Sequence, residues 1–194
     1  MPRSERRNHK IKQVLQHRQP DLTVVMENIH DPHNVSAVFR SCDAVGIMRV
    51  ELLYNLEKFP RIGKKSSSSA NKWLEWRKHT TVAECYAKLR SEGFKIYATH
   101  LAADAVSLYD LDLTHKVALV FGNEHRGVTD EAAAQADGNF VIPMVGMIQS
   151  LNISVACAVS LYEAMRQRLA RNQYGSPKLL PQELERLFNE WLEL

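Results

Sequence analysis

The sequence predicts an α/β protein with a mostly parallel sheet flanked by helices. Apolar runs of strand length alternate with segments whose apolar residues recur at helical spacing. These runs are continuously apolar, which is typical of parallel strands covered on both faces. The 194 residues, 45% of them hydrophobic, suit one domain with short appendages.

The expected elements follow one another along the chain. Pro20 ends a first, basic helix, Asp31 offers an N-cap for a second, and Gly46 is a typical residue just beyond that helix. The expected strands are 22–26, 50–54, 94–99, 117–121 and 140–142. The expected helices are 4–17, 35–45, 81–92, 151–171 and 182–193. We therefore divide the chain into a basic N-terminal helix (1–18), a main domain (19–172) and a C-terminal helical extension (173–194).

Charge is distributed unevenly along a chain whose net charge is only +3. The basic residues gather in 1–18 and in a serine-rich loop over 55–72, whereas 182–194 is acidic. Basic clusters of this kind indicate an anionic partner. The chain has no apolar stretch long enough to span a membrane and three widely spaced cysteines, so we expect a cytoplasmic protein with reduced thiols and no membrane partner.

Several common functional motifs are absent from the sequence. The eight glycines form neither a dinucleotide-binding G-x-G-x-x-G pattern nor a phosphate-binding P-loop. There is no H-E-x-x-H, no C-x-x-C and no G-x-S-x-G. A nucleotide-like cofactor would therefore need a different backbone geometry, and we expect no metal.

Three segments place polar residues beside buried strands. In 33–46, Arg40 lies within an otherwise apolar helix and is either a surface residue or an anion contact. In 118–128, a strand runs into Gly122 and a charged turn, which is either a plain loop or a close approach to a ligand. In 141–156, a methionine-bearing apolar loop precedes Ser150, a candidate N-cap. That loop is either core or the lining of a pocket for an adenine or a thioether.

Together these segments resemble the signature motifs of the TrmH/SpoU branch of the SPOUT methyltransferases. Segments 18–24 and 162–168 are similar to its tRNA-specific members, and the resemblance covers roughly 10–175. It implies a deep C-terminal trefoil knot, a homodimer, and transfer of a methyl group from S-adenosylmethionine to an RNA ribose 2'-hydroxyl, leaving S-adenosylhomocysteine. Because the sequence shows no additional N-terminal RNA-binding domain, we expect a tRNA guanosine as the substrate, and guanosine-18 of the D-loop is the family's best-known target.

The resemblance also implies roles for individual residues. Arg40 would stabilise the developing alkoxide, Asn34 would orient Arg40 or the ribose, and Glu124 would pair with Arg40 or the cofactor's ammonium group or cap a turn. The implied catalytic residues are Arg40, Asn34, Glu124, Ser150 and Asn152. The implied cofactor site is Thr99, His100, Leu101, Gly122, Ile142, Met144 and Leu151. The expected RNA contacts are Arg6, Arg7, Lys10, Arg18, Arg61, Lys64, Lys65 and Arg166.

The sequence leaves three points open. Relatives usually carry glycine before Trp73, where this chain has Ser66 to Ser69 and Ala70. Trp73 and Trp76 either stack on bases or belong to the core. The alternative functions are 2'-O-methylation of rRNA or another tRNA position, and a non-catalytic RNA-binding module of the same fold.

Overall fold

The computed structural model describes residues 3–60 and 72–194. Its centre is a seven-stranded sheet in the order β3-β2-β1-β6-β4-β7-β5, and every pair of neighbouring strands is parallel. The strands are β1 (Leu22–Glu27), β2 (Arg49–Leu53), β3 (Glu75–His79), β4 (Lys95–Thr99), β5 (Val106–Ser107), β6 (Val117–Phe121) and β7 (Gly138–Val141). The helices are α1 (Arg3–Gln16), α2 (Pro32–Ala44), α3 (Val82–Ser91), α4 (Asp130–Gln135), α5 (Ile153–Ala170) and α6 (Pro181–Glu193), with a short 3-10 turn over Leu108–Asp110. The predicted parallel α/β sheet is confirmed, while the trefoil knot stays a prediction.

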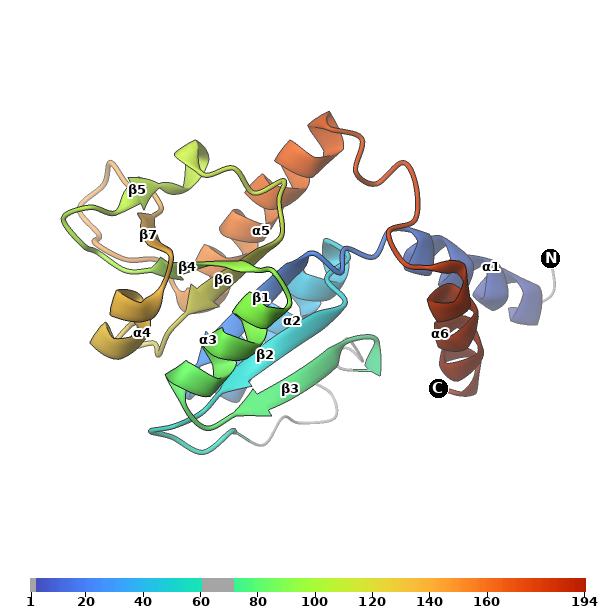
Figure 1. Ribbon diagram of the computed structural model, residues 1–194, viewed down its shortest axis with the longest axis horizontal. Coiled ribbons are helices and arrows are strands. Elements are labelled where there is room, and N and C mark those ends of the chain that lie inside the picture. Colours follow the sequence, from blue (N-terminus) through green and yellow to red (C-terminus); the bar gives the residue numbers. More distant parts are fainter. Residues whose placement is uncertain (1–2, 61–71) are drawn as a thin grey trace.

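Helices cover both faces of the sheet (Figure 1). On one face α2 and α5 pack together, and residues such as Val38 and Leu161 join the sheet's largest apolar cluster. On the other face α3 and α4 bury residues such as Leu89 and Ala132 against the same strands. Because both faces are covered, β1 and β6 are buried along their whole length, which explains their continuous apolar runs.

Three elements escaped the sequence prediction. The edge strand β3 has the sequence Glu-Trp-Arg-Lys-His, which contains no apolar run. It forms because its backbone pairs with β2 from Arg49↔Glu75 to Leu53↔His79, and because Arg77 and His79 both reach the fully buried carboxylate of Glu51. The other two, β5 and α4, have only two and six residues, too few for a periodic pattern.

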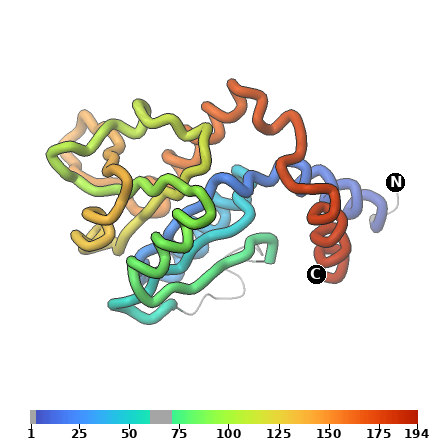
Figure 2. Tube along the Cα trace, in the orientation of Figure 1, coloured from blue at the N-terminus to red at the C-terminus, as the bar shows by residue number. Residues whose placement is uncertain are grey.

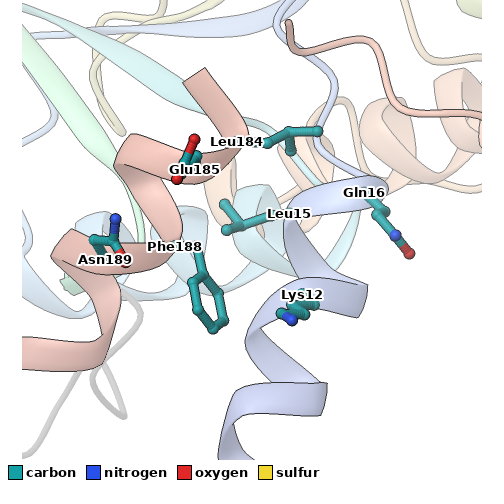
Figure 3. A pocket seen from close by; sticks show the side chains of 7 residues that line it. All are labelled: Lys12, Leu15, Gln16, Leu184, Glu185, Phe188 and Asn189. Carbon is teal, nitrogen blue, oxygen red and sulfur yellow. The ribbon is translucent and has the colours of Figure 1, made fainter. Parts of the chain in front are cut away.

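The two terminal helices, which we expected as appendages of the main domain, pack together. Ile11 and Leu15 of α1 are buried with Leu187 and Trp191 of α6. Figures 1 and 2 show the two helices side by side, set apart from the sheet, with both chain ends on that side. A groove of about 400 Å³ lies between them (Figure 3), lined by Lys12, Leu15, Gln16, Leu184, Glu185, Phe188 and Asn189. Since α1 leads into the amino end of β1, this groove lies away from the edge where parallel sheets bind ligands.

Arg18 corrects one expectation, because its side chain has no exposed surface. The guanidinium donates to the Ile47 carbonyl at 2.8 Å and the Trp73 carbonyl at 3.0 Å, and it pairs with Asp43 at 2.7 Å. It also lies over the Trp191 ring, 5.0 Å from the centroid. Arg18 thus joins α6 to the sheet domain and is not presented to RNA.

Candidate active site

The three polar segments meet at the carboxyl edge of the sheet. The Asn34 amide donates to Glu124 Oε1 at 2.9 Å, and the Asn152 amide donates to Asn34 Oδ1 at 3.2 Å. Asn34 belongs to α2, Glu124 follows β6, and Asn152 precedes α5. A single hydrogen-bonded chain therefore joins three of the five predicted catalytic residues.

Glu124 caps the turn that leads into α2. Its carboxylate accepts the backbone N–H groups of His30 at 2.9 Å and Asp31 at 3.1 Å, besides the Asn34 amide. Partial burial raises the pKa of this carboxyl, but these hydrogen bonds favour the charged form and leave the pKa below its usual value. Of the roles considered from sequence, the structure shows the cap, and it adds a contact with Asn34 that the sequence did not indicate.

Local sequence explains why α2 begins at this point. Asp31 is the N-cap and accepts the His33 N–H at 2.8 Å, and Pro32 occupies the first helical position. The predicted Asp31 cap and Gly46 beyond the helix are confirmed, since Gly46 has a φ of +85°. The expected cap at Ser150 is wrong, because Asn152 caps α5 by accepting the Ser154 N–H at 2.9 Å.

Arg40 stands apart from this hydrogen-bonded chain. It lies six residues after Asn34, about 9 Å farther along the helix axis, and its side chain is exposed. The neighbouring Phe39 is buried against the sheet. Within the described part of the chain, Arg40 forms no hydrogen bond or ion pair, so its guanidinium is available to a ligand.

The predicted cofactor residues lie on three neighbouring strand ends. Thr99 ends β4, and His100 and Leu101 follow it. Gly122 follows β6, and 142–151 follows β7; β4 lies between the other two strands. Thr99 Oγ1 donates to the Val120 carbonyl at 2.9 Å and so ties β4 to β6.

Gly122 is required for a reason the sequence did not indicate. A Cβ at Gly122 would lie 2.1 Å from the carbonyl carbon and oxygen of Gly127. The chain's own turn, joined by the Asn123–Gly127 bridge, fills the space that we had assigned to a ligand. The glycine therefore permits a tight turn after β6. A ligand could contact this position only through the backbone of Gly122.

The loop after β7 has the composition of a binding surface. Val145 and Met147 are fully exposed, and Leu101 across from it is 88% exposed. The backbone of residues 144–150 forms no backbone–backbone hydrogen bond with another described residue. Exposed apolar side chains beside free N–H and C=O groups suit an adenosine, whose base has apolar faces and a polar edge. The residues present thus fit the adenosyl cofactor expected here.

The predicted RNA contacts have different environments. Arg6 and Lys10 are exposed on α1, whereas Arg7 donates to the Trp191 and Leu192 carbonyls at the end of α6. Arg166 is exposed and held by Glu163 through two contacts of 2.8 Å. The remaining three, Arg61, Lys64 and Lys65, lie outside the described residues.

The two tryptophans differ in exposure. Trp73 packs against Trp191 with ring centroids 5.1 Å apart, which supports a core role. Trp76 stacks on Phe39 at 5.7 Å with its rings nearly parallel, yet it remains 42% exposed.

Sequence reasoning missed Asn28, Glu57 and Asn123 at this edge. Asn28 directly follows β1 and has a φ of +51°. Its Oδ1 accepts three consecutive backbone N–H groups, and Glu57 and Asn123 lie on the loops that it joins. The available signal was that Asn28 and Asn123 each lie two residues after the end of a predicted buried strand.

Two negative findings apply to residues 3–60 and 72–194. No described helix is long and apolar enough to cross a membrane. In the same residues, no three His, Cys, Asp or Glu side chains gather in a way that could hold a metal ion.

A parallel sheet with a polar, hydrogen-bonded chain and an apolar loop at its carboxyl edge defines a class of α/β proteins that bind nucleotide-like ligands. Within that class the chain belongs to the SpoU rRNA methylase family, whose model matches residues 21–162.

Comparisons with individual proteins agree with this membership. The chain is 45% identical over 190 residues to the tRNA (guanosine(18)-2'-O)-methyltransferase of Thermus thermophilus, covering 98% of this chain and 97% of the relative. The crystal structure of the A. aeolicus TrmH/SpoU tRNA modifying enzyme superposes with a TM-score of 0.91 at 36% identity, covering 98% of this chain and 96% of that one. The AdoMet-bound rRNA methyltransferase of Sinorhizobium meliloti gives a TM-score of 0.68 at 25% identity, covering 80% of this chain and 59% of that one.

Proposed function

We propose that this protein transfers a methyl group from S-adenosylmethionine to the ribose 2'-hydroxyl of guanosine-18 in tRNA. The observation that carries the proposal is the Asn34–Glu124–Asn152 chain, which joins the three family motifs beside the apolar cofactor loop. The guanosine-18 assignment rests on similarity over nearly the full length to the tRNA enzyme of Thermus thermophilus. The rRNA enzyme of Sinorhizobium meliloti, by contrast, is matched over only 59% of its own length.

The cofactor would be held by the ends of β4, β6 and β7. Backbone groups of Thr99, His100, Gly122 and the loop after β7 read the adenine edge, while apolar side chains enclose the base. The enclosing side chains are Leu101, Ile142, Met144 and Leu151. The bound cofactor supplies an electrophilic methyl group, and S-adenosylhomocysteine is the product. No metal has a role in this scheme.

Arg40 would act on the attacking ribose. Arginine side chains are cations in proteins, so Arg40 would serve as a cation rather than as a base. It stabilises the negative charge that develops on the 2'-oxygen and holds a neighbouring phosphate, while a phosphate oxygen or water accepts the proton. Its exposed position and lack of a partner among the described residues support this role.

The other polar residues would align the reacting groups. Glu124 fixes the start of α2 and the Asn34 amide, and Asn152 joins both to the start of α5. Ser150 is exposed two residues before that cap and would contact RNA. Alignment matters because the methyl transfer is an in-line displacement.

The RNA would be bound chiefly through its phosphates. Arg6, Lys10 and Arg166 are exposed cations, and we extend the proposal to Arg61, Lys64 and Lys65, which precede β3 in the sequence. Arg7 contributes less, because two of its donors already serve α6.

We also propose a homodimer in the cytoplasm, where tRNA is available. Val145, Met147 and Ile148 of the loop after β7, and Val155 and Tyr162 of α5, form an exposed apolar surface. Exposed apolar patches of this kind mark interaction sites. A second copy would cover them and close the cofactor loop.

The function is tested by incubating the protein with methyl-labelled S-adenosylmethionine and tRNA transcripts. We expect label in a transcript with guanosine-18 and none in a transcript with 2'-deoxyguanosine at that position. Label in 23S rRNA but not in tRNA would show that the substrate is rRNA instead of tRNA. Absence of cofactor binding in calorimetry would favour a non-catalytic RNA-binding module.

A further inference from the structure

Asn28 contacts three connections at the carboxyl edge of the sheet. These connections follow β1, β2 and β6, which are adjacent strands. Asn28 is 1% exposed and has a φ of +51°, a left-handed conformation that asparagine tolerates better than most residues. Its backbone carbonyl accepts the Asn123 amide at 2.8 Å, and its own N–H donates to the Leu53 carbonyl at 2.9 Å.

The Asn28 side chain organises the start of the connection after β2. Its Oδ1 accepts the backbone N–H groups of Asn55, Leu56 and Glu57 at 3.2, 3.1 and 3.2 Å. Its amide donates to Asn55 Oδ1 at 2.7 Å. Three consecutive N–H groups converging on one oxygen fix the backbone that carries Glu57.

Glu57 then reaches across to the other two connections. Its carboxylate accepts the Asn123 amide at 3.3 Å and pairs with Arg126, and it lies 2.9 Å from His30 Nδ1. Two carboxylates thus connect the turn 123–126 to its neighbours, one from Glu57 and one from Glu124 of the turn itself. Glu57 holds Asn123 and Arg126, and Glu124 of the same turn holds the start of α2.

We propose that Asn28 is a positioning residue for methyl transfer, acting through Glu57 on the turn that carries Glu124. This inference rests on the proposed function. By fixing residues 55–57, Asn28 orients Glu57, Glu57 fixes the turn 123–126, and that turn sets the Asn34–Glu124–Asn152 chain at the reacting ribose. Small displacements of aligned groups have large effects on an in-line transfer.

The test uses the full-length protein and two substitutions of Asn28. Asn28→Gly keeps the left-handed backbone and removes the accepting oxygen, so we expect kcat for tRNA methylation to fall about tenfold. The Kd of S-adenosylmethionine should change less than about twofold, because most of the residues proposed to hold it follow β4 and β7, and Gly122 after β6 contributes only its backbone. Asn28→Asp keeps the accepting Oδ1 and loses the amide donor to Asn55 Oδ1, so it should retain a higher kcat than Asn28→Gly.

Asn172 supplies a matched control. It is the other described non-glycine residue with a positive φ, at +54°, and lies after α5. The neighbouring Gln173 donates to the Thr114 carbonyl near the amino end of β6, at the opposite edge of the sheet. Asn172→Gly should leave kcat unchanged, and unfolding curves of every variant separate turnover from stability.

A double-mutant cycle tests the route through Glu57. If Asn28 acts through Glu57, Asn28→Gly combined with Glu57→Ala should lower kcat no further than Glu57→Ala alone. Additive losses would overturn the route, and so would unchanged turnover in Asn28→Gly or a failed rescue by Asn28→Asp. Failure of the unmodified protein to methylate tRNA would instead reject the proposed function, which distinguishes the two failures.

Discussion

The two halves of the carboxyl edge are built differently. The loops after β1, β2 and β6 are joined by side-chain hydrogen bonds from Asn28, Glu57, Glu124 and Asn34. The loop after β7 exposes apolar side chains, and its 144–150 backbone has no backbone partner among the described residues. The first half holds its shape with its own residues, whereas the second gains contacts when a ligand or another copy covers it. Rigidity is therefore built in where alignment matters, and apolar surface is left where binding matters.

The largest expected effect on turnover is at Arg40, which is tied to neither half. Arg40→Ala should lower kcat by about a hundredfold to a thousandfold, because it removes a charge directed at the developing oxyanion. The Kd of S-adenosylmethionine should stay within about twofold. The matched control is Arg186→Ala, since Arg186 is an exposed arginine on α6 that pairs with Glu190. Unchanged turnover in Arg40→Ala would remove this residue from the mechanism.

The hydrogen-bonded half is tested most directly at Glu124. Glu124→Gln keeps the size but weakens the acceptor shared by His30, Asp31 and Asn34, so we expect kcat to fall about tenfold. In the unmodified protein burial opposes the charge of Glu124, but its hydrogen bonds leave the pKa lowered. The favourable contribution of a lowered carboxyl is present above its ordinary range and is lost as pH falls through the lowered value. The substitution should therefore abolish the acid-side decline that Glu124 contributes to the pH profile of kcat, and an unchanged profile would contradict this.

The apolar half is tested by Ile148→Asp. A carboxylate in the loop after β7 should weaken S-adenosylmethionine binding about tenfold and shift the protein toward monomers, because it would have to be buried on binding. Calorimetry and sedimentation measure the two effects. Leu180→Asp is the control, since Leu180 is 65% exposed at the start of α6. Equal effects of both substitutions would show that the loop after β7 has no particular role in cofactor binding or dimerisation.

A smaller effect on RNA binding is expected on α1. Replacing Arg6 and Lys10 together by alanine should raise the Kd for tRNA about threefold at moderate salt and reduce the salt dependence, because two phosphate contacts are lost. Lys88→Ala on α3 is the matched control, removing an exposed cation that pairs with Glu92. A double variant that binds tRNA as the unmodified protein does would exclude α1 as a contact.

The substitution Glu51→Gln should have the smallest effect on methylation, although it should lower the stability of the fold markedly. Burial raises the Glu51 pKa, but hydrogen bonds from His79 and Arg77 and the charges of Arg77 and Arg49 lower it from 4.5 to about 2. This stabilisation is present above pH 4.5 and is lost as pH falls toward 2. Glu51→Gln should cost about 3 kcal/mol at neutral pH, because it removes the charge of a fully buried carboxylate that pairs with Arg49 and Arg77.

Urea unfolding at a series of pH values measures the Glu51 effect. The difference between Glu51→Gln and the unmodified protein should shrink below pH 4.5, while kcat at neutral pH should change less than about twofold. A difference that is independent of pH would show that the charge of Glu51 is not its source.

Sequence reasoning succeeded where the signal was local. The continuous apolar run that became β6 matches the observed strand at both ends, Val117–Phe121, because burial on both faces leaves a composition that can be read directly. The cap at Asp31 was readable for the same reason, since it depends on two neighbouring residues. Asn34, Glu124 and Asn152 were assigned from the family resemblance, and their contacts agree with a shared site.

The polar residues that were predicted wrongly depend on partners that are distant in the sequence. Arg18 and Arg6 are similar in sequence terms, yet Arg18 is buried because Asp43 and the Ile47 carbonyl lie beside it in the fold. Ser150 was the predicted cap of α5, but Asn152 caps that helix and also contacts Asn34 of α2, which is distant in the sequence.

The sequence by itself determined the alternation of buried strands and amphipathic helices, the charged terminal helix and the identity of the functional motifs, because these depend on composition within a few residues. The tertiary structure alone decided which polar groups satisfy one another. A hydrogen bond or ion pair between groups such as Glu57 and Arg126 depends on how the strands are ordered in the sheet, and strand order is set by the packing of the whole chain rather than by any one segment.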